Sequence, residues 1–148
     1  MKKVLRFQKL MTVVALALSV MIAAADDGGG KGGSNAGEVR LRAKLAGPLI
    51  QNRTPEGSAD FRSDHNSRTR LNVEVENVNL PAGTVLTVAV LHGGTSITAG
   101  TITLSSTGFG ELELESQHGA MVPTVQPGDM VTVTSGTTTI VAGVFGSV

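Results

Sequence analysis

Hydrophobic and polar residues alternate with a period of two along most of the chain beyond residue 37. The segment EVRLRAKL (38–45) places its apolar residues on one face and two arginines and a lysine on the other, and RLNVEVENV (70–78) alternates in the same way. TVLTVAVLH (84–92) is almost continuously apolar, which is typical of a central strand covered on both sides. Valine, isoleucine and threonine dominate these segments, so the pattern predicts strands.

Short turn-forming segments separate the expected strands. Turn residues occur at 64–67, 80–83, 92–94, 106–108, 126–129 and 135–136. About eight strands are expected, at 38–45, 58–63, 70–78, 84–92, 95–105, 110–116, 130–135 and 137–145. The spacing indicates hairpin meanders over 68–92 and 92–105. Two longer connections, 47–57 and 117–128, are long enough to cross between sheets. This arrangement predicts one all-β domain, a single antiparallel Greek-key β-sandwich or a squashed barrel.

The N-terminal residues do not follow this pattern. Four basic residues precede the apolar run LMTVVALALSVMI, and Ala23 and Ala25 follow it. This order is that of a secretory signal peptide, expected at 1–25, and cleavage would leave Asp26 at the N-terminus. Residues 26–37 include six glycines and predict a flexible linker. The β-sandwich domain is therefore expected at 38–148, in an exported protein of the periplasm or the extracellular space.

Removing the signal peptide changes the charge balance. The remaining chain has eight Lys and Arg against twelve Asp and Glu, a net charge of −4. This charge gives no general attraction to nucleic acid or anionic lipid, and no membrane span is expected after cleavage. The chain has no cysteine, tryptophan or tyrosine. The fold must therefore hold without disulfides, and the absence of aromatic platforms argues against carbohydrate- and single-strand-binding modules.

Charged residues are divided unevenly along the domain. Residues 38–70 hold seven Lys and Arg and four acidic residues, whereas residues 71–148 hold six acidic residues and no Lys or Arg. In GELELES, Glu111, Glu113 and Glu115 share one face of a strand, about 6.7 Å apart. We expect them to face solvent near the basic row of the segment 38–45 and to perform no chemistry. A weak calcium patch or a carboxylate pair for catalysis is the competing interpretation.

The histidines offer another candidate site. His65, His92 and His118 each lie in or beside an expected turn, at spacings that match no common metal motif. Because turns can converge at one end of a sandwich, these histidines together with Asp129 form an alternative metal- or small-ligand site. The sequence otherwise predicts no catalytic residue, no metal and no cofactor, and it contains no G-x-S-x-G nucleophile motif.

The C-terminal segment is uncharged after Asp129. A strand without charge or proline is poorly protected against pairing with another chain. We expect it to lie centrally in the sheet, and the alternative is a homo-oligomer interface.

The order of several short motifs resembles that of small exported bacterial domains of unknown function. These motifs are LRAKLAG, EGSADF, TRLNVEVENVNLPAGT, AGTITLSSTGFGELEL, VQPGDMVTV and IVAGVF. The chain is also loosely similar to CHRD (chordin-type) β-sandwich domains, although it keeps only His92 where those domains commonly carry an H-x-H segment. The resemblance implies a β-sandwich fold and export, and no enzymatic activity.

Together these features predict a non-enzymatic exported module with a structural, surface or partner-binding role. The expected partner is an unknown protein or component of the cell envelope. The alternative function is a periplasmic metal- or small-ligand-binding domain.

Overall fold

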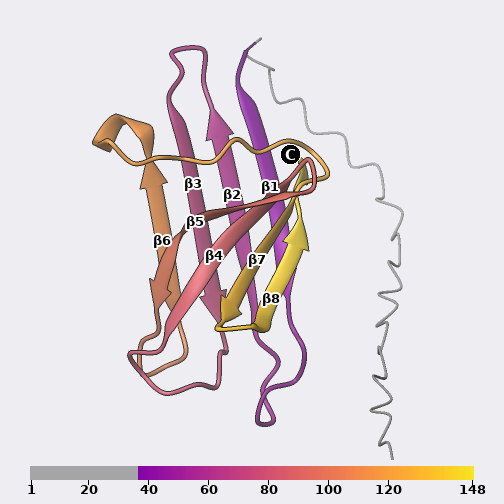
Figure 1. Ribbon diagram of the computed structural model, residues 1–148, viewed down its shortest axis with the longest axis vertical. Coiled ribbons are helices and arrows are strands. Elements are labelled where there is room, and N and C mark those ends of the chain that lie inside the picture. The colour runs from indigo at the N-terminus through magenta and orange to yellow at the C-terminus, as the bar shows by residue number, and fades with distance from the viewer. Residues whose placement is uncertain (1–36) are drawn as a thin grey trace, which may run out of the picture. The chain divides into compact units, whose positions relative to one another are not determined.

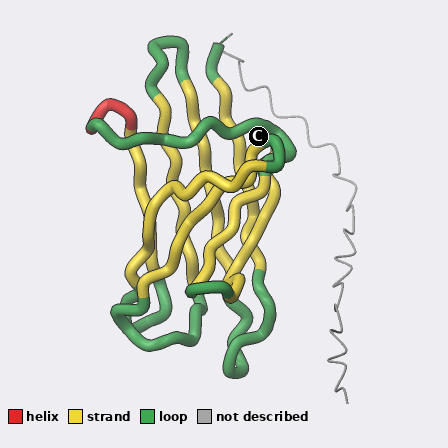
Figure 2. Tube along the Cα trace, in the orientation of Figure 1, coloured by secondary structure: helices red, strands yellow, loops and turns green. Residues whose placement is uncertain are grey.

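The computed structural model describes residues 37–148, so the expected signal peptide and residues 26–36 of the expected linker lie outside the described residues. The described chain is all-β (Figure 1). Its strands are β1 (Val39–Ala46), β2 (Glu56–Ser63), β3 (Thr69–Glu76), β4 (Val85–His92), β5 (Thr95–Thr103), β6 (Gly110–Glu115), β7 (Met130–Ser135), β8 (Thr138–Val144) and β9 (Gly146–Ser147). One short 3₁₀ helix, η1 (Ser116–His118), follows β6 (Figure 2). All eight expected strands are present, and β9 was not predicted.

The strands form one antiparallel sheet that is nearly closed into a barrel. Their order is β5-β4-β7-β8-β1-β2-β3-β6, with β9 also paired to β1. In Figure 1, β6, β3, β2 and β1 form one wall, and β5, β4, β7 and β8 form the wall in front of it. The end strands β5 and β6 meet tightly at one point, where a methyl group on Gly110 would overlap Ile102. The prediction of an antiparallel all-β domain is confirmed.

One of the two predicted crossovers is wrong. Residues 47–55 connect β1 to β2, which are neighbours paired from Val39 opposite Ser63 to Ala46 opposite Glu56. The connection does not cross because it contains its own tight turn at Gln51 and Asn52, whose φ angles are 45° and 66°. The backbone groups of Ile50 and Arg53 bond to each other across this turn, at 2.8 and 3.0 Å.

The chain crosses at two places, and one of them was predicted. Residues 77–84 lead from β3 to β4, which do not pair with each other, so the meander expected over 68–92 is also wrong. The segment 119–129 leads from η1 to β7, across the end of the barrel (Figure 1). This second crossing confirms the prediction for 117–128.

The uncharged C-terminal segment lies inside the sheet. β8 pairs with β7 along its length and with β1 where Ala142 lies opposite Ala46. The close approach of β8 to β1 depends on Gly143, because a methyl group there would overlap the carbonyl oxygen of Lys44. The predicted central position of this segment is therefore confirmed.

The core fills the space between the two walls. The alternation in the sequence selects the inward residues: in β1, Leu41, Ala43 and Leu45 are buried, while the arginines and the lysine between them are exposed. In β3, three alternate apolar residues have no exposed surface. The largest buried side chain is Phe145, which follows β8. Leu112 and Leu114 of β6 are partly buried against this core, as expected for the residues between the glutamates.

Candidate functional site on the outer face

The outer face of β1, β2, β3 and β6 holds most of the charged residues of the domain. Because these strands are antiparallel and in register, their outward residues form rows that run across the strands. One row joins Arg40 of β1 to Arg62 of β2 and to Arg70 of β3, and ends at Glu115 of β6. We call Arg40, Arg62 and Arg70 the arginine row. Like charges directly opposite each other destabilise a sheet, so this row calls for a physical explanation.

Carboxylates hold the arginine row in place. Glu38 accepts two hydrogen bonds from Arg40, at 2.9 and 3.2 Å, and also contacts Nε of Arg62 at 3.2 Å. The hydrogen bond from Arg40 is the main reason that the pKa of Glu38 is lowered. Arg70 pairs with Glu113 and, at 3.2 Å, with Glu115. The three arginine side chains still expose 51–56% of their surface, so each guanidinium has N–H groups that face solvent.

The next row contains Arg42, Asp60, Asn72 and Glu113. Nε of Arg42 donates to Oδ1 of Asp60 at 2.7 Å, and this bond raises the pKa of Arg42. The Oδ1 atom of Asn72 is buried and has no hydrogen-bond partner among residues 37–148. A buried oxygen without a donor is uncommon in folded proteins, so the centre of this face has an unused acceptor.

These two rows line a groove. Its volume is about 390 Å³, and its charged lining consists of the arginine row, Arg42 and Asp60. Val148 borders the groove beside Arg40, where the two backbones are joined by a hydrogen bond of 3.4 Å. A second, smaller hollow of about 120 Å³ lies on the other side of Arg62 and Arg70. The groove has the size of a small-ligand site, and four arginines lie around it.

The opposite end of the same face is acidic. Glu74 of β3 lies opposite Glu111 of β6, and Glu56 of β2 lies opposite Glu76 of β3. Burial is the main effect that raises the pKa of Glu74, and the neighbouring carboxylates of Glu76 and Glu111 raise it further. The face is therefore polarised along the strands, from an arginine-rich end to a glutamate-rich end.

The glutamate row of β6 is placed differently from the prediction. In the sheet, β6 is paired with β3. Two strands, β2 and β3, therefore separate it from the basic strand β1. Glu113 and Glu115 pair with Arg70, so their cation does come from residues 38–70 but not from β1. Glu111 and Glu113 are exposed, as predicted, whereas Glu115 is half-buried, with 24% of its side chain exposed. The expected proximity to Arg40, Arg42 and Lys44 is wrong, because the sheet order could not be read from spacing.

The structure brings together two of the four residues of the alternative site. His92, at the end of β4, contacts Asp129 at 2.8 Å between Nδ1 and Oδ2. His118 contacts Glu115 instead, at 3.0 Å, and 79% of its side chain is exposed. His65 lies in the β2–β3 turn, against the backbone of Gly37. Within residues 37–148, no three His, Asp or Glu side chains are grouped closely enough to hold a metal ion.

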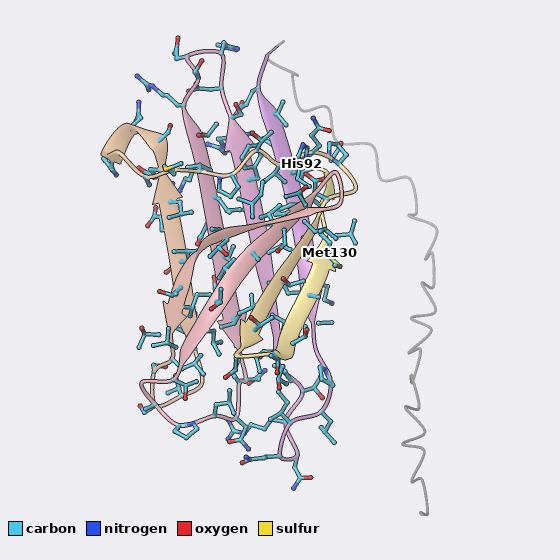
Figure 3. The ribbon with its side chains drawn as sticks, viewed as in Figure 1. His92 and Met130 are labelled. Atoms are coloured by element: carbon cyan, nitrogen blue, oxygen red, sulfur yellow. The ribbon has the colours of Figure 1, made fainter. Side chains whose placement is uncertain are left out.

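The His92–Asp129 pair connects the end of β4 to the turn that precedes β7. His92 lies where the segment 119–129 passes over the barrel end, and Met130 begins β7 directly after Asp129 (Figure 3). Asp129 also accepts a hydrogen bond from the backbone N–H of Gln126, at 2.7 Å. Burial alone would raise the pKa of Asp129, but the bonds from His92 and Gln126 outweigh it, so this pKa is lowered.

We expect Asp129→Asn to lower the free energy of unfolding at pH 7 by about 1–2 kcal/mol, because a buried acceptor loses its charge-assisted bonds. The pKa of Asp129 in the folded protein lies below its ordinary value of 3.8. The ionised carboxylate therefore stabilises the folded state fully above pH 3.8, and this stabilisation is lost as the pH falls through the folded-state pKa. The difference between the wild type and the variant should thus shrink from about pH 5 to about pH 2 in urea denaturation. A constant difference over that range would contradict the assigned role.

Comparisons with known proteins assign no family to this chain. No protein-family model matches it, and no curated protein matches it significantly. The described strands and their single short helix include no helix long and apolar enough to cross a membrane.

Alternation in the sequence places Arg40 on the outer face but does not show that Arg62 and Arg70 belong to the same row. A signal for them was available: both lie four residues from Asn66, within the expected turn, so an antiparallel hairpin centred on Asn66 places them opposite each other. Arg40 belongs to the row because β1 pairs with β2. The length of the 47–55 connection predicted a crossover instead of this pairing.

Proposed function

We propose that this protein is a non-enzymatic exported module that binds a component of the cell envelope, and that the arginine-lined groove is its binding site. One observation carries the proposal: three arginines lie directly opposite one another on adjacent strands beside a groove. Like charges placed opposite each other destabilise a sheet, and in the free protein Glu38, Glu113 and Glu115 offset this effect for the arginine row. The arginines still expose 51–56% of their side-chain surface, so their solvent-facing N–H groups are free to donate to a negatively charged ligand.

Export to the periplasm or the extracellular space is part of the proposal. It is supported by the basic–apolar–Ala order of residues 1–25. We propose that the mature chain begins at Asp26.

A Greek-key sandwich and a relationship to CHRD domains belong to the same proposal. The chain order supports the topology: β4 and β5 form a hairpin, β6 follows at the adjoining end of the sheet, and β7 returns beside β4. This connectivity corresponds to a Greek key if β5 and β6 are counted as neighbours. The proposed CHRD relationship rests on the motif order in the sequence alone.

The test is to compare the retention of native envelope material by two variants of the full-length chain. Arg40→Gln, Arg62→Gln and Arg70→Gln together remove the arginine row, and Arg53→Gln removes an arginine that does not line the groove. We expect the triple variant to lose retention while keeping its melting temperature, and the Arg53 variant to behave as the wild type. Equal retention by all three proteins would refute the proposed binding site.

The alternative function, a metal- or small-ligand-binding domain that uses turn histidines, has one observation in its favour. Asp129 orients His92 through Nδ1, and carboxylates often orient metal-binding histidines in this way. A melting temperature raised by zinc, copper or calcium and restored by EDTA would support this alternative.

A further inference from the structure

We propose that the ligand of the arginine-lined groove is a short run of phosphate groups that lies across β1, β2 and β3. This inference rests on the proposed function and specifies the ligand of the same site. The groove is built from Arg40, Arg42, Arg62 and Arg70. Lys44, the only lysine among the described residues, lies one row beyond Arg42 toward the acidic end. Arginine binds oxyanions through two parallel N–H groups, which lysine cannot do.

The internal carboxylates explain why the ligand is a phosphate and not another carboxylate. Glu38, Asp60, Glu113 and Glu115 already contact the four arginines. A carboxylate from a ligand would replace one of them by a group of equal charge and equal geometry. A phosphate monoester carries a charge of about −1.5 to −2 and three acceptor oxygens, so it can contact two neighbouring guanidinium groups at once.

The polarity of the face sets the direction of the ligand. Adjacent strands are about 4.8 Å apart, so the arginine row spans roughly 10 Å from β1 to β3. Along the strands, a chain of phosphates would meet Glu74 and Glu111 two rows away. Across the strands it meets only the row itself, which ends at Glu115 on one side and at Val148 on the other. The site therefore fits two or three phosphate groups, and it rejects long polyanions such as nucleic acid.

The unused acceptor of Asn72 adds a second requirement. Asn72 belongs to the row next to the arginine row, and its buried Oδ1 atom has no donor in the part of the chain that the structure describes. Asn72 also lines the groove, so a rotation of its side chain would bring this atom to a ligand hydroxyl group next to the phosphates, which would supply that donor. Phosphorylated sugars have this chemistry, whether they are free in solution or attached to a lipid.

Calorimetric titration of the full-length chain with tripolyphosphate tests the proposal. We expect saturable binding that weakens as salt is added, and at least about tenfold weaker binding of citrate, whose three acidic groups are carboxylates. Arg62→Lys keeps the charge at the centre of the row but loses the paired donors, and should weaken tripolyphosphate binding about tenfold. Arg53→Lys is the matched control and should bind as the wild type. Unchanged melting temperatures show that the variants are folded.

Two further arms of the experiment identify the source of the phosphates. Glucose 1,6-bisphosphate represents a soluble ligand, and phosphatidylcholine vesicles with or without phosphatidic acid represent a membrane-bound one. Binding of either probe that is lost in Arg62→Lys supports the proposal and identifies the source. The proposal is overturned if no phosphate probe binds, if citrate binds as tightly as tripolyphosphate, or if Arg62→Lys binds as the wild type. If envelope retention still depends on the arginine row in that case, the proposed function stands and only its phosphate ligand is wrong.

Discussion

Phe145→Ala is expected to lower the free energy of unfolding by about 3–5 kcal/mol, because it removes a fully buried aromatic ring and leaves a cavity. Only 1% of Phe145 is exposed. Its backbone N–H donates to Asp129 at 2.9 Å and its carbonyl accepts from Gly128 at 2.8 Å, so the ring is fixed between β8 and the turn before β7. Urea denaturation followed by circular dichroism measures the change.

Phe109→Ala is the matched control for this prediction. Phe109 is 38% exposed, so its removal creates little cavity and should cost clearly less than the loss of Phe145. If the two variants lost the same stability, Phe145 would not occupy the core as described.

Gly143→Val is expected to destabilise the domain by about 3 kcal/mol, although valine favours strands. A side chain at position 143 would overlap the carbonyl oxygen of Lys44 and crowd Leu45, so β8 and β1 would have to separate. This contact is where β8 joins the sheet to β1, and the variant should also expose backbone amides of both strands to hydrogen exchange.

Gly146→Val controls for the change of residue type. No atom lies within 4 Å of a methyl group built on Gly146, so valine fits there without displacement. Stability should change by less than about 1 kcal/mol in this variant. An equal loss in both variants would mean that close approach of β8 and β1 is not the cause.

The local structure of this protein could be predicted from its sequence, and the order of its strands could not. Period-two alternation identified eight strands and the inward residues of β1 and β3, because burial of one face of a strand leaves that signature directly. The strand order depends on which connections cross the barrel. Residues 47–55 are long but turn back at Gln51 and Asn52, and neither residue signals a left-handed turn as strongly as glycine does.

The candidate site was predictable only in part for the same reason. Alternation placed Arg40 and Arg42 on the outer face, and charge segregation indicated that the glutamates of β6 needed a cation from residues 38–70. Recognition of Arg62 and Arg70 as their neighbours required the register of three strands. The pairing of His92 with Asp129 joins residues 37 positions apart, and spacing alone gave no reason to prefer it to a pairing with His65 or His118.

Chemical footprinting of arginine tests most directly whether the groove is the binding site. The exported protein would be treated with phenylglyoxal, alone and bound to native envelope material, and the modified arginines identified by mass spectrometry. Binding should protect Arg40, Arg42, Arg62 and Arg70, whose side chains are 51–62% exposed in the unbound protein, and should leave Arg53 reactive. Protection of Arg53 with continued modification of the arginine row would contradict the account.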